Sequence, residues 1–141
     1  GGRNLISHIG EAYDALPVDC QEALASERFV EGVFFQIRNA GGELDPYQVV
    51  EIGSDGRRIF RFTARGIKKQ DSDRKRDLLI AMDKSLQTKA MVVDLHPGDL
   101  LLLNQRVMTH AREPLGSPQE AIAPESRRLL RRLFMNYGNF I

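Results

Sequence analysis

The sequence contains a single cysteine, Cys20, in 141 residues. One cysteine excludes an internal disulfide and an all-cysteine zinc site, and it fits a reducing compartment. Long apolar runs are also missing: the runs at residues 78–82 and 100–103 are far shorter than the roughly 20 residues that a membrane-spanning helix needs. We see no secretory signal. We therefore expect a cytoplasmic protein that does not enter a membrane.

The chain has almost no excess charge of one sign, since 20 Lys and Arg stand against 19 Asp and Glu. A net charge of +1 gives no overall field that attracts nucleic acid or anionic lipid, so any anion site has to be local. The basic cluster at residues 68–76 is interleaved with acidic residues and lacks aromatic residues for base stacking. That pattern favours a solvated loop, and we expect neither nucleic acid nor a membrane as a partner.

The rest of the composition is that of a globular protein, with 42% hydrophobic and 28% charged residues, and the length fits one domain over residues 1–141. Apolar spacing predicts a helix that Asn4 caps and Pro17 ends. Asp19 and Glu22 have the spacing of a capping box, which predicts a second, short helix through Leu24.

Strand signals follow these two helices. Residues 29–38 are rich in aromatic and β-branched residues. Residues 48–52 and 58–62 flank Ser54-Asp55-Gly56, which is typical of a hairpin. A charged loop at residues 68–77 then leads into a helix whose apolar face holds Leu78, Leu79, Met82 and Leu86.

The last third of the chain predicts more strands: residues 91–95, a turn at 96–99, a short buried strand at 100–103 and a final strand at 127–136. Residues 113–126 contain several prolines and predict a long surface loop. Two helices, about six strands and one inserted helix indicate an α+β protein with a mostly antiparallel sheet or part of a barrel.

Candidate functional side chains gather near the C-terminal end. His110 comes shortly after the apolar run, and the predicted final strand carries two pairs of arginines. Arg128 and Arg132 are four residues apart, so they share one face of a strand, while Arg127 and Arg131 share the other. A buried arginine needs an anionic partner, and its planar fork matches a carboxylate. A bound dicarboxylate would be such a partner, whereas composition alone also fits a solvated edge strand.

These stretches resemble the C-terminal half of the Fe(II)/2-oxoglutarate-dependent dioxygenases of the taurine dioxygenase and clavaminate synthase-like superfamily. That family shows a Gly-Asp-apolar-Asn-Arg-Arg-x-x-His-Gly-Arg run and then an Arg-Arg-x-x-x-Arg strand. The chain has Gly98-Asp99 followed by Asn104-Gln105-Arg106-Val107-Met108-Thr109-His110-Ala111-Arg112, and then Arg127-Arg128 to Arg132. Its opening, Gly1-Gly2-Arg3-Asn4 through Ala12-Tyr13-Asp14-Ala15-Leu16-Pro17, is similar to the family's Gly-Gly-x-Thr and Ala-Tyr-x-x-Leu-Pro segment.

The resemblance implies a double-stranded β-helix, which is a cupin-like jelly roll, with flanking helices. It implies that His110 is the second histidine ligand of Fe(II) and that Arg128 binds the distal carboxylate of 2-oxoglutarate. Arg132, Arg112 and Arg106 are weaker candidates for contacts to co-substrate or substrate. The implied activity is hydroxylation of an unactivated carbon of a small molecule, with 2-oxoglutarate and dioxygen converted to succinate and carbon dioxide.

The sequence departs from the family in its metal ligands. Two histidines and one carboxylate hold iron in such enzymes, and the family's His-x-Asp or His-x-Glu pair does not occur here, because Ile9 follows His8 and Pro97 follows His96. A jelly roll usually has eight strands, and we count about six. We therefore expect a C-terminal portion of a larger jelly roll. The alternatives are a metal-free jelly-roll module that binds a small carboxylate without catalysis and, less favoured, a nucleic-acid binder.

Overall fold

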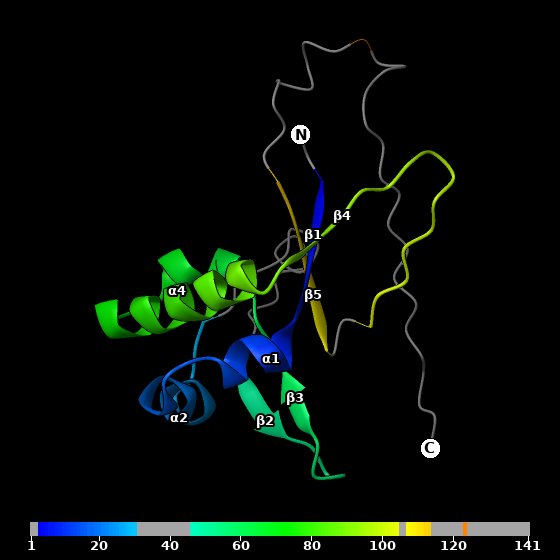
Figure 1. The fold of residues 1–141 in the computed structure, drawn as a ribbon. Helices are drawn as coiled ribbons and strands as arrows, with labels where there is room; N and C mark the ends of the chain where they lie inside the picture. Colours follow the sequence, from blue (N-terminus) through cyan, green and yellow to red (C-terminus); the bar gives the residue numbers. More distant parts are fainter. Residues whose placement is uncertain (1–2, 31–45, 105–106, 114–122, 124–141) are drawn as a thin grey trace, which may run out of the picture.

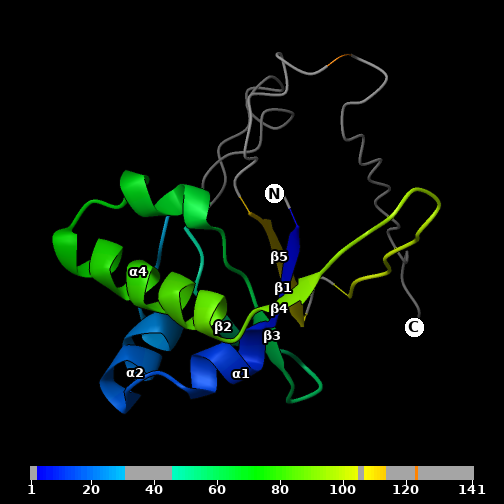
Figure 2. The ribbon, with the colours of Figure 1, turned by 45° about the horizontal axis from the view of Figure 1, so that its top comes forward.

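The computed structural model describes residues 3–30, 46–104, 107–113 and 123. The helices are grouped on one side of a small sheet, and a separate hairpin lies below them (Figures 1 and 2). In chain order the elements are β1 (Asn4–His8), α1 (Ile9–Asp14), α2 (Val18–Ser26), β2 (Val50–Ile52), β3 (Arg58–Phe60), the 3-10 helix η1 (Ala64–Lys69), α4 (Asp73–Thr88), β4 (Met91–Val93) and β5 (Met108–Arg112). This mixture of helices and small antiparallel sheets confirms the α+β class.

The first element is a strand, so the predicted helix from Asn4 is wrong in its first turn. β1 is the central strand of the order β4-β1-β5 and pairs antiparallel with both neighbours. Two hydrogen-bonded edges outweigh the local helical spacing, and the side chain of Asn4 donates to the carbonyl of Val93 at 3.5 Å instead of capping a helix. The helix begins at Ile9, where His8 Nδ1 accepts a hydrogen bond from the amide of Glu11 at 3.2 Å.

The second helix is present, but its predicted cap is not. α2 begins at Val18, Pro17 precedes it, and no side chain caps it, so Asp19 and Glu22 form no capping box. Proline is favoured at helix starts because its φ is already near the helical value. The helix also continues beyond Leu24 to Ser26.

The hairpin β2–β3 is confirmed, with Val50 opposite Phe60 and Ile52 opposite Arg58. Gly56 adopts φ +75°, a value that favours glycine because it has no Cβ. The amide of Gly56 donates to the carbonyl of Gly53 at 3.0 Å, which closes the turn.

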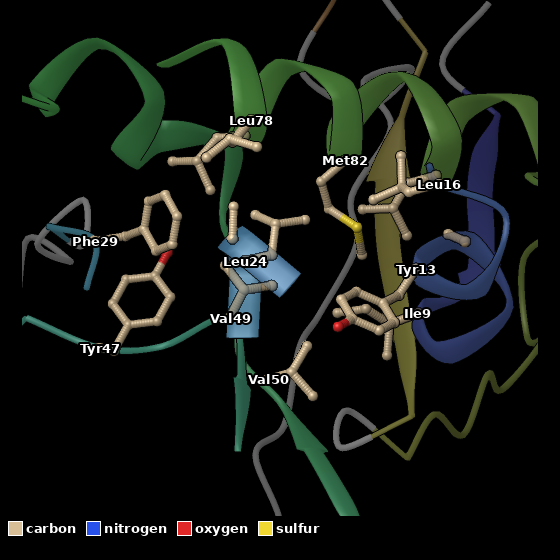
Figure 3. Close-up of a cluster of buried hydrophobic side chains, with 14 residues drawn as sticks. Ile9, Tyr13, Leu16, Leu24, Phe29, Tyr47, Val49, Val50, Leu78 and Met82 are labelled. Carbon is tan, nitrogen blue, oxygen red and sulfur yellow. The ribbon is translucent and has the colours of Figure 1, made fainter. Parts of the chain in front are cut away.

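The core lies between α4, the two short helices and the hairpin (Figure 3). The helix predicted after the charged loop is α4, and the four apolar residues predicted for its buried face are all buried. The loop predicted at residues 68–77 is wrong for most of its length, because Lys68 and Lys69 end η1 and α4 already begins at Asp73. Ser72 caps this helix by accepting from the amide of Lys75 at 3.3 Å. The core cluster comprises Ile9, Ala12, Tyr13, Leu16, Ala23, Leu24, Phe29, Tyr47, Val49, Val50, Leu78, Leu79, Met82 and Leu86.

One isolated bridge brings together residues on either side of 31–45. The backbones of Phe29 and Tyr47 exchange two hydrogen bonds of 2.7 and 2.9 Å. The buried side chain of Gln70 pairs with the backbone of Val30, donating to its carbonyl at 2.7 Å and accepting from its amide at 3.0 Å. Most of the predicted strand at residues 29–38 lies outside the described residues.

The apolar run at residues 100–103 is not the buried strand predicted from its sequence. Leu100 and Leu102 are 81% and 67% exposed, and no strand of the described ranges includes or pairs with this run. An apolar run forms a buried strand only where a neighbouring strand and a covering layer exist. The turn before it is confirmed, since the amide of Asp99 donates to the carbonyl of His96 at 3.0 Å and Gly98 has φ +96°.

The predicted strand at residues 127–136 and nearly all of the predicted loop at 113–126 lie outside the described residues. Within the described ranges, no helix has both the length and the apolar character that crossing a bilayer requires.

Candidate functional site

His110 is the central residue of β5, directly opposite Ile6 of β1. The sequence predicts no strand here, because residues 108–112 lack the apolar alternation of a half-buried strand. β5 forms because its backbone completes the free edge of β1 over five residue pairs, from Asn4 opposite Arg112 to His8 opposite Met108. The predicted metal ligand therefore lies on an edge strand that is hydrogen-bonded to β1, the central strand of the sheet.

The pairing register decides which side chains share a face with His110. Paired residues on antiparallel strands point to the same face, and successive residues alternate. His110 and Arg112 therefore share a face with Ile6 and Asn4. Ile6 and Asn4 are only 4% and 2% exposed, and Ile6 does not belong to the core cluster that α4 covers.

The opposite face of β1 and β5 is turned toward α4. Ser7 Oγ donates to the carbonyl of Leu86 in α4 at 2.7 Å, and Thr109 lies opposite Ser7. The sheet thus has one face against the helices and another that carries the imidazole of His110. The side chain of His110 is half-buried, whereas Arg112 is exposed.

An ion pair closes the β1–β5 ladder beside this site. Arg3 Nε and Nη2 donate to the carboxylate of Glu113 at 2.9 and 2.8 Å, and the amide of Glu113 donates to the carbonyl of Arg3 at 3.0 Å. The hydrogen bonds from Arg3 lower the pKa of Glu113, and those to Glu113 raise the pKa of Arg3.

A cavity of about 650 Å³ lies between α4, the sheet and residues 62–65. His110 and Arg112 are among its lining residues, together with Ser7, Leu86 and Thr109. Because side chains alternate along β5, the register places the imidazole of His110 on the opposite face of the sheet from Ser7 and Thr109. This cavity is therefore separate from the face where a metal would meet the ring.

The structure describes only part of the predicted site. Arg128, Arg132 and Arg106 lie outside the described residues, so the predicted convergence of His110 and Arg128 on one cavity stays a prediction. The described part of the chain contains no group of three His, Cys, Asp or Glu side chains that could hold a metal ion.

The other two histidines have local structural roles. His8 caps α1. The amide of His96 donates to Asp99 Oδ2 at 2.7 Å within an exposed turn.

Sequence reasoning missed Asn4, which it interpreted as a helix cap. Asn4 places a buried polar side chain on the face of His110. The strand pairing that positions it is not visible in the local sequence.

No protein-family model and no curated protein matches the sequence. Among solved structures, the chain matches a "putative alpha-ketoglutarate dependent 2,4-D dioxygenase from Burkholderia xenovorans" with a TM-score of 0.59 at 16% sequence identity. The fold is similar to that of a dioxygenase. The match covers 79% of this chain and 50% of the solved one, so the chain corresponds to about half of that protein's length.

Proposed function

We propose that this chain is the C-terminal portion of an Fe(II)/2-oxoglutarate-dependent dioxygenase with a double-stranded β-helix, or jelly-roll, fold. The observation that supports the proposal most is the likeness in fold to the alpha-ketoglutarate-dependent protein, which covers 79% of the chain. The position of His110 adds to it, because the imidazole lies on the sheet face opposite α4, beside the buried side chains of Asn4 and Ile6.

His110 would supply one of the two imidazoles that hold iron in such enzymes, together with a carboxylate. The described residues contain one imidazole in a suitable position and no neighbouring group that completes the set. The other two ligands would come from a part of the polypeptide that corresponds to the other half of the solved relative. When bound, iron and 2-oxoglutarate would supply the oxidising power that hydroxylates a carbon of a small molecule, with succinate and carbon dioxide as co-products.

The remaining residues would bind and orient. The guanidinium of Arg128 would hold the distal carboxylate of 2-oxoglutarate through two parallel hydrogen bonds. Arg132, Arg112 and Arg106 are candidates for contacts to co-substrate or substrate, and Arg112 already lies on the face of His110. The protein's contribution is therefore orientation and metal geometry.

The test is an anaerobic Fe(II) titration of the whole polypeptide that carries this chain, followed by measurement of succinate formed from 2-oxoglutarate under oxygen. We expect uptake of one Fe(II) and its loss in His110→Ala. The control His96→Ala changes an exposed histidine of the turn and should leave uptake unchanged. Arg128→Lys should raise the KM for 2-oxoglutarate, because lysine keeps the charge but loses the fork.

If the protein binds 2-oxoglutarate without Fe(II) and forms no succinate, the proposal that it is an enzyme is wrong. That result would instead support the second function considered from the sequence, a metal-free module that binds a small carboxylate. Equal iron uptake by His110→Ala and the native protein would remove His110 from the metal site.

A further inference from the structure

The cavity on the α4 side of the sheet has two regular walls. Asp83, Leu86 and Gln87 line it from α4 at positions i, i+3 and i+4, which is one face of a helix, and Ala90 lines it from just beyond the end of that helix. Leu5, Ser7, Thr109 and Ala111 line it from β1 and β5, and the register places these four on one face of the sheet. A volume of about 650 Å³ is within the range of small-molecule sites.

The lining combines an apolar interior with one negative charge that has no cationic partner among the described residues. Leu5, Phe62, Leu86 and three alanines, Ala64, Ala90 and Ala111, provide apolar surface. The half-buried carboxylate of Asp83 accepts one hydrogen bond, from Gln87 Nε2 to Oδ2 at 2.7 Å.

The other charged residues of the lining are Arg65, Arg112 and Glu113. The carboxylate of Glu113 is neutralised by Arg3. Arg65 has an interaction of its own within the chain, and the side chain of Arg112 points to the face of His110. Asp83 is therefore the lining carboxylate that has no cationic partner in the described ranges.

We propose that this cavity binds a small organic amine whose ammonium group contacts Asp83 and whose hydrocarbon body packs against Leu5, Leu86 and Ala111. An ammonium group has three N–H donors and no acceptor. Asp83, the free amide oxygen of Gln87 and the hydroxyl of Thr109 are acceptors within the same lining. A half-buried carboxylate gains more from a charged donor than a fully solvated one does, because the local dielectric is lower.

This site is distinct from the proposed iron site, since the two lie on opposite faces of β5. Its test needs neither iron nor turnover. Failure of the dioxygenase proposal therefore leaves the amine site unaffected, and the reverse also holds.

The experiment is a titration of the isotopically labelled protein with hexylammonium chloride, followed through the backbone amide signals of Ala90 and Ala111. Hexanol and hexanoate are the neutral and anionic probes of matched length. We expect saturable shifts with hexylammonium, and weaker binding of both other probes. Asp83→Asn should weaken hexylammonium binding about tenfold, as expected for the loss of one charge-assisted contact, and should change hexanol binding little.

Asp77→Asn is the matched control, because Asp77 is an exposed carboxylate on the same helix and does not line the cavity. It should bind hexylammonium as the native protein does. Ala111→Leu fills the cavity from the sheet side and should weaken hexylammonium and hexanol together. Thermal melting of each variant shows that the fold is retained.

Three results would overturn the proposal. One is the absence of saturable shifts with hexylammonium. Another is equal binding of hexylammonium and hexanol, which would show an apolar cavity without charge recognition. The third is unchanged hexylammonium affinity in Asp83→Asn.

Discussion

Arg3 and Glu113 join the start of β1 to the residue that follows β5 through two side-chain hydrogen bonds of 2.9 and 2.8 Å and one backbone hydrogen bond of 3.0 Å. The two side chains are partly exposed, so the pair contributes little by charge alone. Its two parallel hydrogen bonds extend the register of the two strands by one more residue pair. His110 is three residues before Glu113 and depends on the same register.

We predict that this pair makes stability depend on acid pH. The pKa of Glu113 is lowered in the folded chain from its ordinary 4.5, so the unfolded chain binds the proton first. The stabilisation is complete above about pH 4.5 and is lost as the pH falls through the folded pKa. Thermal melting of the native protein and of Glu113→Gln between pH 7 and pH 3 should give melting temperatures that converge on acidification.

Glu51→Gln is the control for that series, because Glu51 is an exposed carboxylate of β2 without a partner in the described chain. Its difference from the native protein should not shrink in the same way. Melting curves of Glu113→Gln that stay parallel to the native ones at every pH would show that the pair carries no proton linkage.

Arg58 connects the hairpin to α1. Its guanidinium forms a two-point ion pair with Asp14, which lowers the pKa of that carboxyl, and lies 5.8 Å from the ring centre of Tyr13 and 5.4 Å from that of Phe60. We predict that Arg58→Ala lowers the free energy of unfolding by about 1 kcal/mol. Arg58→Lys should cost less, since it keeps the charge but not the planar fork.

Chemical denaturation measures these differences, and Arg57→Ala is the control because its side chain is 86% exposed. Equal midpoints for Arg57→Ala and Arg58→Ala would show that the stack on the two rings contributes nothing.

Leu79 is fully buried at the centre of the core cluster, and the next residue on α4, Ile80, is 37% exposed. We predict that Leu79→Ala lowers the free energy of unfolding by about 2 to 5 kcal/mol, because it removes buried surface and leaves a cavity. Ile80→Ala removes a side chain of equal size from the same helix and should cost clearly less. Urea unfolding of both variants gives the comparison, and similar losses would place Leu79 outside the core.

His8 Nδ1 accepts the hydrogen bond that caps α1, at a helix start that the sequence did not predict. We predict that His8→Ala destabilises the protein by about 1 kcal/mol and that His8→Asn recovers much of this loss, since asparagine is a favoured cap. Equilibrium unfolding of the two variants measures the difference. If alanine and asparagine destabilise the protein equally, the hydrogen bond to Glu11 contributes no stability.

The sequence predicted those elements whose contacts are between residues close together in the chain. The face of α4 that holds Leu79 and Met82 followed from helical spacing, and the hairpin followed from Asp55-Gly56. β1 and β5 were missed because they are strands through distant pairing, β5 with β1 and β1 with both β5 and β4. Ile6 and His110 come from opposite ends of the chain, and no short window of sequence contains their pairing.

The sequence offers the residue types of the candidate site but not their geometry. The resemblance of the run around His110 to a known family predicts its imidazole as a metal ligand, and that role stays a prediction. Which face of the sheet carries it depended on the register with β1. Residues 100–103 show the converse error: hydrophobicity predicted burial, but burial requires a covering partner that the described chain does not contain.

The bridge between Phe29 and Tyr47, together with the amide of Gln70 against Val30, holds the two sides of residues 31–45 next to each other. Gln70 also donates to the carbonyl of Gly66 at 2.8 Å, so one buried amide joins the 3-10 helix η1 to the segment beside this bridge. Replacing that single side chain would remove hydrogen bonds from two segments that lie far apart in the sequence.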